Sequence, residues 1–362
     1  MSIIIEDQTT DLTLLHYQGV NDNSELVVKQ TRGHILNEEK EVVCASFGYT
    51  QEYKVEQRDV FEPLLGDVKN VTFYRAEEGS LLRLFFHDHQ WHLSTFKRIN
   101  AFESRWSSSK TFGELFVDAL DYFFTHGAGN GKLSFEKGDV FNVFCHTLDP
   151  SLVYTFLLRT NQDTKIVCRP PLDPTVFFSG CFKNGERMLS NTTLIPSPEV
   201  LTFSTVDEVC AYVDKVDPVE HQGVIAMIPD QTTLKIVHPV NMAYKTIRGS
   251  EPDIEQAYFR VRKNPEELEQ FKVLFPHVKT ELIETKLTEM KKYLHHMYVR
   301  RFIKKLYTIV HPTLFFSMKK AHIWHIENRA TNIVTLEKIT SIVDEQSYSS
   351  LCKMYQEFNV IM

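Results

Sequence analysis

The segment FYRAEEGSLLRLFF, Phe73 to Phe86, joins two runs of strand-forming residues through a short acidic turn. Aromatic and aliphatic residues dominate both runs, and such residues are enriched in strands. The turn reads Glu77-Glu78-Gly79-Ser80, and its glycine and serine favour a change of chain direction. The segment therefore predicts a strand, a turn that carries two carboxylates, and a second strand.

Short strand-like runs separated by Gly, Asn, Asp and Pro continue on both sides of this segment, from residue 26 to about residue 250. One helix is marked within this region, because Thr111 and Glu114 form a capping box before FGELFVDALDYFF, and His126-Gly127 follows it. Strands without a regular strand–helix alternation indicate an α+β fold of antiparallel sheets with flanking helices.

The periodicity changes to helical after about residue 260. Asn264 and Pro265 provide a helix cap and a proline at the first helical position. A longer amphipathic helix follows, with an apolar stripe formed by Ile283, Leu287, Met290, Leu294 and Met297. We therefore predict two domains, residues 1–258 and an all-α domain of residues 259–362.

Composition excludes several classes of protein. Apolar residues make up 43% of the 362 residues, and no apolar run approaches the roughly 18 residues of a membrane span. The start MSIIIEDQTT has no features of a secretory signal, so we expect a cytoplasmic protein without a membrane partner. The six cysteines form no CxxC pair, so we expect them to be reduced and buried.

Charge is distributed unevenly along the chain. The net charge of −7 gives no global attraction to nucleic acid. From Lys279 to Lys320, however, ten Lys and Arg residues face only three glutamates. The candidate RNA-contacting residues in this basic segment are Lys291, Lys292, Arg300, Arg301, Lys304 and Lys305.

The order of motifs resembles that of the covalent nucleotidyltransferases, which include RNA and DNA ligases and mRNA capping enzymes, and in particular the phage-type RNA ligases. Thr31-Arg32-Gly33 is similar to the "ARG" element that precedes the nucleotide-attaching motif in those ligases, and AEEGS (76–80) is similar to that motif, Lys-x-Asp-Gly. YTFLLRTNQDTKIVC (154–168), QGVIA (222–226) and LKIV (234–237) resemble the third, fourth and fifth motifs. The resemblance implies a nucleotidyltransferase domain that binds a nucleotide between its halves.

The chain departs from these motifs where the chemistry of the family needs particular groups. The lysine whose amine bonds to the α-phosphate is replaced by Ala76, and Arg75 is a poor nucleophile because its guanidinium stays protonated. The metal-positioning glutamates of the third and fourth motifs are replaced by Leu157 or Leu158 and by Gln222. The second lysine of the fifth motif is Val237. The resemblance thus implies a binding protein without catalytic residues, metal or cofactor.

The retained residues indicate what such a site would bind. Arg32 and Lys235 are candidates for contacts with phosphates, and Glu77 or Glu78 for hydrogen bonds with a guanine edge. An acidic group with stacked aromatics suits the positively charged cap of mRNA. The candidate stacking residues are Phe73, Tyr74, Trp91, Tyr154 and Phe156. His87, His89 and His92 flank Trp91 in an expected hairpin turn, which does not favour a metal site there.

Three hypotheses follow from this pattern. The first is a degenerate nucleotidyltransferase-fold protein that binds an RNA 5′ end, in particular the mRNA cap, with its C-terminal helices on RNA or on a partner from the translation machinery. Lysine-less relatives are typical of giant DNA viruses, so the resemblance implies the cytoplasm of an infected host cell. The second is an active RNA ligase or capping guanylyltransferase that uses magnesium, ATP or GTP and a displaced lysine such as Lys29 or Lys97. The third is a scaffold that retains only the fold.

Overall fold

Two compact units, Met1–Lys245 and Thr246–Met362, make up the chain. The computed structural model describes residues 2–106, 108–136, 138–161, 167–188, 193–229, 232–251 and 253–361. The boundary predicted at 258/259 differs from this division and falls inside helix α7 (Ile254–Val261). Phe259 of that helix packs on Tyr355 of α12 (Tyr348–Ile361), with ring centroids 5.4 Å apart, so α7 belongs to the second unit.

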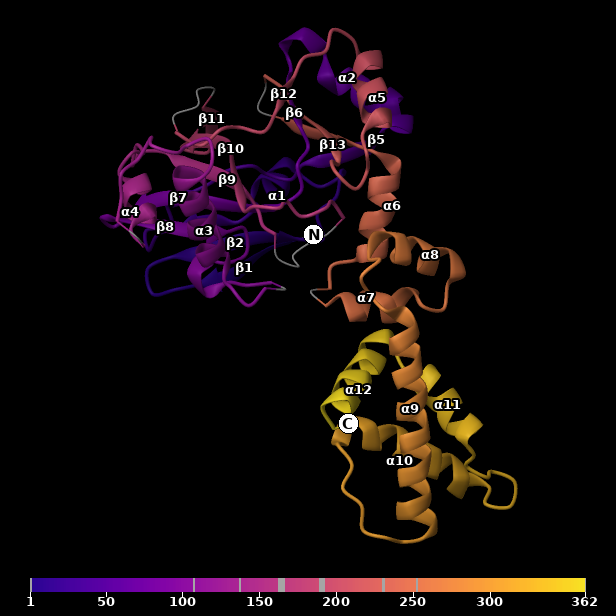
Figure 1. Cartoon of the computed structure of the whole chain (residues 1–362). Helices are drawn as coiled ribbons and strands as arrows, with labels where there is room; N and C mark the ends of the chain where they lie inside the picture. Colours follow the sequence, from indigo (N-terminus) through magenta and orange to yellow (C-terminus); the bar gives the residue numbers. More distant parts are fainter. Residues whose placement is uncertain are drawn as a thin grey trace. The chain divides into compact units, whose positions relative to one another are not determined.

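The first unit contains three sheets (Figure 1). The amino-terminal sheet has the order β1-β2-β3-β4, from Ser2–Gln8, Thr13–Gln18, His34–Leu36 and Val42–Cys44. The β7–β9 sheet has the order β11-β10-β9-β7-β8, from Glu186–Met188, Thr175–Lys183, Val153–Arg159, Ser80–His87 and Gln90–Thr95. The β6–β13 sheet has the order β12-β6-β13-β14-β5, from Val200–Leu201, Thr72–Arg75, Gly223–Met227, Thr233–Val237 and Gln51–Lys54. All pairs are antiparallel except β14 with β5.

The acidic turn connects two different sheets. The strands predicted on its two sides are β6 and β7, and β6 pairs with β13 while β7 pairs with β8 and β9. The turn residues 76–79 therefore carry the chain from one sheet to the other. This connection places the two carboxylates where the sheets meet.

Strand β7 is buried on both faces, which explains its nearly continuous apolar sequence. Leu82 and Leu84 contribute to the core beneath α3 (Phe112–Thr125) and α4 (Val140–Cys145). Phe85 contributes to the core shared with the amino-terminal sheet. The capping box predicted for α3 is confirmed, since Thr111 accepts from the Glu114 backbone N–H and the Glu114 carboxylate accepts from that of Thr111.

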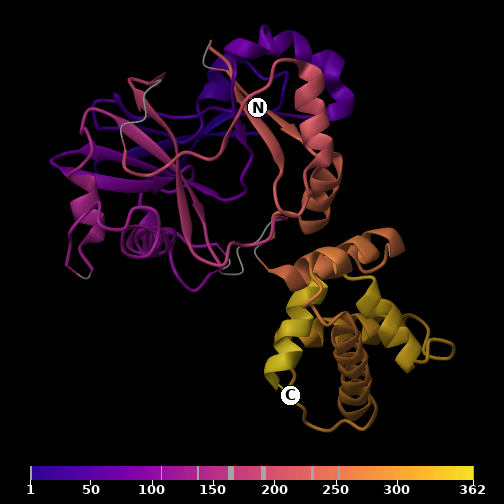
Figure 2. The same ribbon diagram turned by 45° about the horizontal axis from the view of Figure 1, so that its top comes forward.

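Helices α2 (Arg58–Leu65) and α5 (Val206–Lys215) cover the β6–β13 sheet, and Figures 1 and 2 show them side by side. Their apolar faces supply Phe61 and Val209 to the core of this sheet. The remaining short elements are α1 (Leu26–Gln30) and the 3-10 helices Val55–Gln57, Val68–Asn70 and Ala101–Glu103. Helix α6 (Pro239–Arg248) spans the division between the units.

Every other element in the described part of the second unit is helical, which confirms the predicted class of an α+β domain followed by helices. The elements after α7 are α8 (Pro265–Leu274), α9 (Thr280–Tyr298), a π-helical turn (Val299–Ile303), α10 (Pro312–Glu327), α11 (Leu336–Asp344) and α12. Helices α10, α11 and α12 pack around α9, as Figure 2 shows. Tyr298 is buried at the end of the predicted apolar stripe, whereas Met297 is only half-buried.

The structure also bears on the predictions from composition. Each of the six cysteines is a buried thiol outside any disulfide. Within the described ranges, no helix has the length and apolar character that crossing a bilayer requires.

Candidate functional site

A cleft of about 370 Å³ lies where the acidic turn joins the two sheets. Its walls come from β5, β6, β13 and β14 on one side and from β7, β9 and β10 on the other. Its volume falls within the range of about 300–1,000 Å³ that is typical of small-molecule sites. The cleft is therefore large enough for a nucleotide.

Six of the predicted binding residues meet in this cleft. They come from the loop before β3, from β6, from the acidic turn, from the residue before β13 and from β14: Arg32, Tyr74, Glu77, Glu78, Gln222 and Lys235. Ala76 is fully buried beside them, since its N–H donates to the Gly223 carbonyl and its carbonyl accepts from the Gln222 N–H. These hydrogen bonds bring the turn next to residues that are more than 100 positions away in the sequence.

Four of the five predicted stacking residues do not reach the cleft. Tyr154 and Phe156 are fully buried in the core beneath α3, and Trp91 packs against the edge of that core. The reason is that successive side chains of a strand point to opposite faces of the sheet. Tyr154 and Phe156 face α3, whereas the next residue, Leu157, faces the cleft. Phe73 is likewise buried, in the core under α2 and α5.

The aromatic side chains that do line the cleft are Tyr74 and Phe47. The sequence analysis missed Phe47, whose ring packs edge-to-face on Phe182 with centroids 4.9 Å apart. The only signal for it was its place in the Gly48-containing loop after strand β4. Two aromatic faces are therefore available to a base in this cleft.

Glu77 has a structural role. Its side chain is fully buried and forms ion pairs with Arg75 (2.6 Å) and with Arg159, and His221 Nδ1 lies 3.5 Å from it. Both of its oxygens are engaged by guanidiniums and its side chain has no exposed surface, so a ligand would have to break a buried ion pair to reach it. Glu77 therefore fixes the turn to β9 and does not read a base.

Glu78 is held differently, by neutral donors. Its carboxylate accepts from the backbone N–H groups of Val167 and Cys168, both at 2.8 Å, and from the Gln222 side-chain amide at 3.0 Å. Since a carboxylate offers about four lone-pair sites, one acceptor site remains. Glu78 lines the cleft, so a base donor can reach it. Residues 162–166 of the third-motif segment lie outside the described residues.

Four cationic side chains line the cleft, and one of them, Arg75, is already paired with Glu77 and Glu199. Lys235 is almost fully enclosed and donates to the Gln222 side-chain oxygen, with Glu52 3.5 Å away. Burial lowers the pKa of Lys235, and Glu52 opposes that shift. Lys245 of α6 pairs with Glu52 at 2.9 Å, and Arg32 donates to the Gly48 carbonyl at 3.2 Å and lies over the Phe96 ring at 4.2 Å.

The positions that the motif resemblance aligns with metal-positioning glutamates carry neutral side chains. Of the two leucines considered for the third motif, Leu157 faces the cleft and Leu158 does not. Val237 is buried away from the cleft lining. Among the described residues no group of three or more His, Cys, Asp or Glu is arranged to hold a metal ion.

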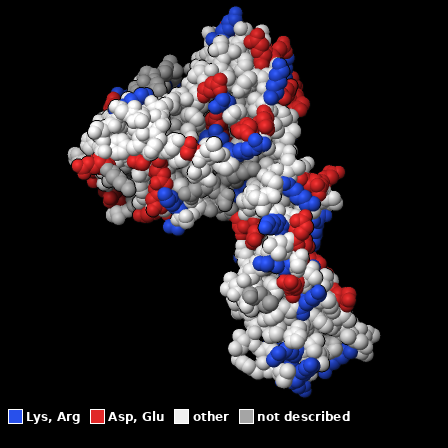
Figure 3. All heavy atoms as spheres, in the orientation of Figure 1, with Lys and Arg blue, Asp and Glu red and all other residues white. Residues whose placement is uncertain are grey.

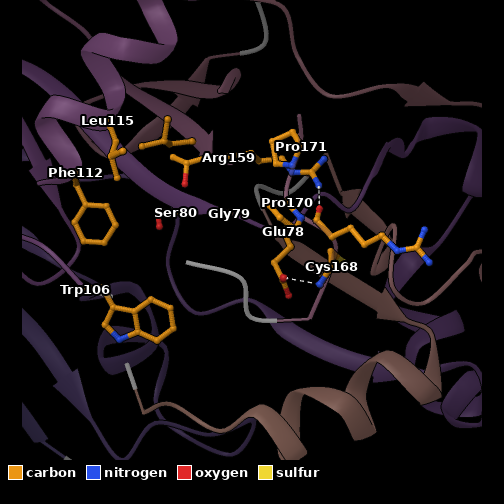
Figure 4. A pocket seen from close by; sticks show the side chains of 13 residues that line it. Glu78, Gly79, Ser80, Trp106, Phe112, Leu115, Arg159, Cys168, Pro170 and Pro171 are labelled. Atoms are coloured by element: carbon orange, nitrogen blue, oxygen red, sulfur yellow. Dashed lines mark hydrogen bonds between the residues drawn. The ribbon is translucent and has the colours of Figure 1, made fainter. Parts of the chain in front are cut away.

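A second, smaller pocket of about 60 Å³ lies behind the acidic turn (Figure 4). Trp106 and Phe112 line one side, and Glu78, drawn with its hydrogen bond to Cys168, lies on the other. This volume accommodates a few water molecules but not a nucleotide. The pocket is therefore too small to be the nucleotide site.

The basic segment, Lys279 to Lys320, runs through α9, the π-helical turn and the loop after it into α10. No Asp or Glu occurs between Glu289 and Glu327, and Figure 3 shows Lys and Arg gathered at the lower end of the second unit. Lys291 must be removed from the predicted RNA-contacting set, because it pairs with Asp344 at 2.9 Å and is 12% exposed. The other members are exposed: Lys292, Arg300, Arg301, Lys304 and Lys305.

Fold and site together define an α+β protein with a cationic, aromatic cleft between two sheets and a helical second unit. No protein-family model matches the chain. It is 25% identical over 286 residues to an immediate-early protein ICP-46 homolog of Invertebrate iridescent virus 6, with 73% of this chain and 61% of that protein aligned. It is also 25% identical over 356 residues to a putative bifunctional polynucleotide kinase/RNA ligase of Autographa californica nuclear polyhedrosis virus, with 92% of this chain and 49% of that protein aligned.

The chain thus spans about half to three fifths of the length of these two relatives. Similar solved structures include a putative ATP-dependent DNA ligase from Aquifex aeolicus, at 12% identity and a TM-score of 0.43, over 75% of this chain and 68% of that one. An archaeal ATP-dependent RNA ligase aligns at 12% identity and a TM-score of 0.40, over 74% of this chain and 65% of that one.

Proposed function

We propose that the chain binds the 5′ end of an RNA, in particular its cap, in the cleft and does not attach the nucleotide to itself at Ala76. The observation that carries this proposal is the convergence of Arg32, Lys235 and Tyr74 in one cleft. Cationic side chains suit phosphates, and an aromatic face suits a base. The relatives are viral proteins, one of them named as a putative RNA ligase, which supports RNA ends as the ligand and an infected cell as the setting.

The cap is favoured over an unmodified end by the chemistry of the cleft. A methylated guanine carries a positive charge, which strengthens its stacking on the faces of Tyr74 and Phe47. The remaining acceptor site of Glu78 suits the donors on the guanine edge. A cap also carries phosphates for Arg32 and Lys235.

Titration with a methylated cap analogue, GTP and ATP tests this proposal. We expect binding of all three with the cap analogue bound most tightly, and Tyr74→Ala should weaken cap binding by about 10-fold because stacking contributes about 1–3 kcal/mol per base. Leu64→Ala, at an exposed leucine of α2 outside the cleft, is the matched control and should bind normally. If none of the three ligands binds or raises the melting temperature, the scaffold hypothesis is favoured instead.

A second candidate function is an RNA ligase or guanylyltransferase that uses a displaced lysine. The lysines considered from sequence lie outside the cleft lining, and Lys29 donates to the Asp22 carbonyl at 2.5 Å. Lys235 is the better candidate, because it lies in the cleft and its pKa is lowered by burial, which favours the free amine. Its nitrogen would attack the α-phosphorus of ATP or GTP with release of pyrophosphate.

Incubation with magnesium and α-labelled ATP or GTP separates the two candidates. A labelled band that disappears in Lys235→Arg would establish the second candidate and contradict the first. An unlabelled protein that still binds the cap analogue supports the first.

We further propose that the exposed basic residues of the second unit contact the RNA backbone. Lys304→Glu should weaken binding of a single-stranded RNA and reduce the slope of log affinity against log salt by about 0.7. Lys353→Glu, an exposed position on α12, is the control with the same change of charge. If both variants bind RNA equally well, a protein of the translation machinery becomes the better candidate for this surface, which also exposes Tyr307 and Ile309.

A further inference from the structure

Glu52 of β5 occupies the cationic wall of the cleft. Its carboxylate lies 2.9 Å from Lys245 Nζ and 3.5 Å from Lys235 Nζ. Lys235 lies opposite Glu52 in the register of β14 and β5, so their side chains project from neighbouring backbone positions. One carboxylate thus bridges two lysines from different elements.

Electrostatics keep this carboxylate charged. Burial acts to raise the pKa of Glu52, but Lys235 and Lys245 outweigh it and hold the pKa below its usual value. Arg32 faces the same cleft, and its only oxygen partner in the described structure is the neutral Gly48 carbonyl. The nearby Glu78 is held by Gln222 and two backbone N–H groups. Glu52 is therefore the carboxylate that directly balances the lysines of this wall.

A phosphate group offers the same kind of partner to these lysines, with oxygen acceptors and negative charge. We propose that Glu52 holds the place of a ligand phosphate in the unliganded cleft, and that the ligand carries a chain of phosphates that displaces it. This inference rests on the proposed function, because it assumes that nucleotides enter the cleft. The inference assigns to Glu52 a role that opposes ligand binding. It also predicts a preference for polyphosphates, because several phosphate groups compete better than one with Glu52 for Lys235 and Lys245.

The exposure of Glu52 and Lys245 is compatible with displacement of the Glu52 carboxylate by a phosphate. Its side chain is 29% exposed and that of Lys245 is 47% exposed, and pairs this accessible contribute little to stability. Breaking the pair therefore costs little when a phosphate takes over the lysines. A metal-binding role for Glu52 fits poorly, because a cation would be repelled by the two ammonium groups.

Glu52→Gln tests the inference. The neutral amide no longer competes for the lysines, so we expect the affinity for GTP to rise by about 2- to 5-fold, with smaller gains for GDP and GMP and none for guanosine. The gain should shrink at high salt, because it is electrostatic. Glu62→Gln is the matched control, since it removes the same charge from an exposed position on α2 and should leave affinity unchanged.

A second variant keeps the test informative if the glutamine disturbs the fold. Glu52→Asp retains the charge but withdraws it by one methylene, and should give an intermediate gain. Equal or weaker GTP binding by both variants, at a melting temperature like that of the wild type, would overturn the inference while leaving the proposed function intact. Absence of nucleotide binding by the wild type would contradict the proposed function itself.

Discussion

Replacing Lys235 by methionine is expected to lower the affinity of the cleft for GTP by about 10- to 100-fold. A hydrogen bond to a charged group contributes about 1.5–3 kcal/mol, and the enclosed position of Lys235 limits the screening of its charge by water. Methionine fills a similar volume, and Glu52 keeps Lys245 as its partner, so the fold should persist. Isothermal titration of both proteins with GTP measures the difference.

Lys245→Met serves as the comparison for this prediction. Its side chain is 47% exposed, so solvent weakens its interaction and we expect only about a threefold loss of affinity. If Lys235→Met binds GTP as tightly as the wild type, Lys235 does not contact phosphate and the cleft is not the nucleotide site that we propose.

Gly223→Ala is expected to destabilise the protein by about 4 kcal/mol or more. Gly223 has a φ of +136°, and a Cβ atom there would lie 2.1 Å from the Ile236 carbonyl oxygen. The neighbouring strand β14 would have to move, and the hydrogen bond from the Ala76 N–H to the Gly223 carbonyl would be disturbed. Urea denaturation monitored by circular dichroism gives the free energy of unfolding.

Gly19→Ala separates strain in the backbone from the steric clash. Gly19 also has a positive φ, of +69°, but nothing lies within 4 Å of a Cβ atom there. Alanine at that position should cost only about 1 kcal/mol. A loss for Gly223→Ala no larger than that for Gly19→Ala would show that β13 and β14 are not packed as closely as the structure indicates.

Strand β9 was predictable from the sequence, but the orientation of its side chains was not. The pattern YTFLLR predicted a strand, and the structure confirms one at Val153–Arg159. The pattern did not reveal which face meets the cleft, because both faces of this strand are buried and apolar. The same pattern makes Tyr154 and Phe156 candidates for stacking, whereas in the structure Leu157 faces the cleft and the two aromatic residues pack beneath α3.

For charged residues, too, the local sequence does not reveal which partners the side chains meet. Lys291 and Asp344 are 53 positions apart, and nothing in either local sequence predicts that they pair. Glu77 and Glu78 are adjacent in the acidic turn, yet one is locked between guanidiniums and the other accepts from neutral donors. Their different roles arise from Arg159 of β9 and from Gln222, just before β13, which are both distant in sequence from the turn.

Local patterns in the sequence thus determined the strands, the capped helices, the α+β class and the helical C-terminal region, because those features depend on neighbours within a few residues. Order and spacing of motifs were enough to select Arg32, Tyr74, Glu78, Gln222 and Lys235, which the fold brings into one cleft. Only the tertiary structure decided which carboxylate is available, which aromatic faces are open and that Glu52 balances the lysines. Those properties depend on contacts between residues far apart in the chain, which exist only once the two sheets are joined at the acidic turn.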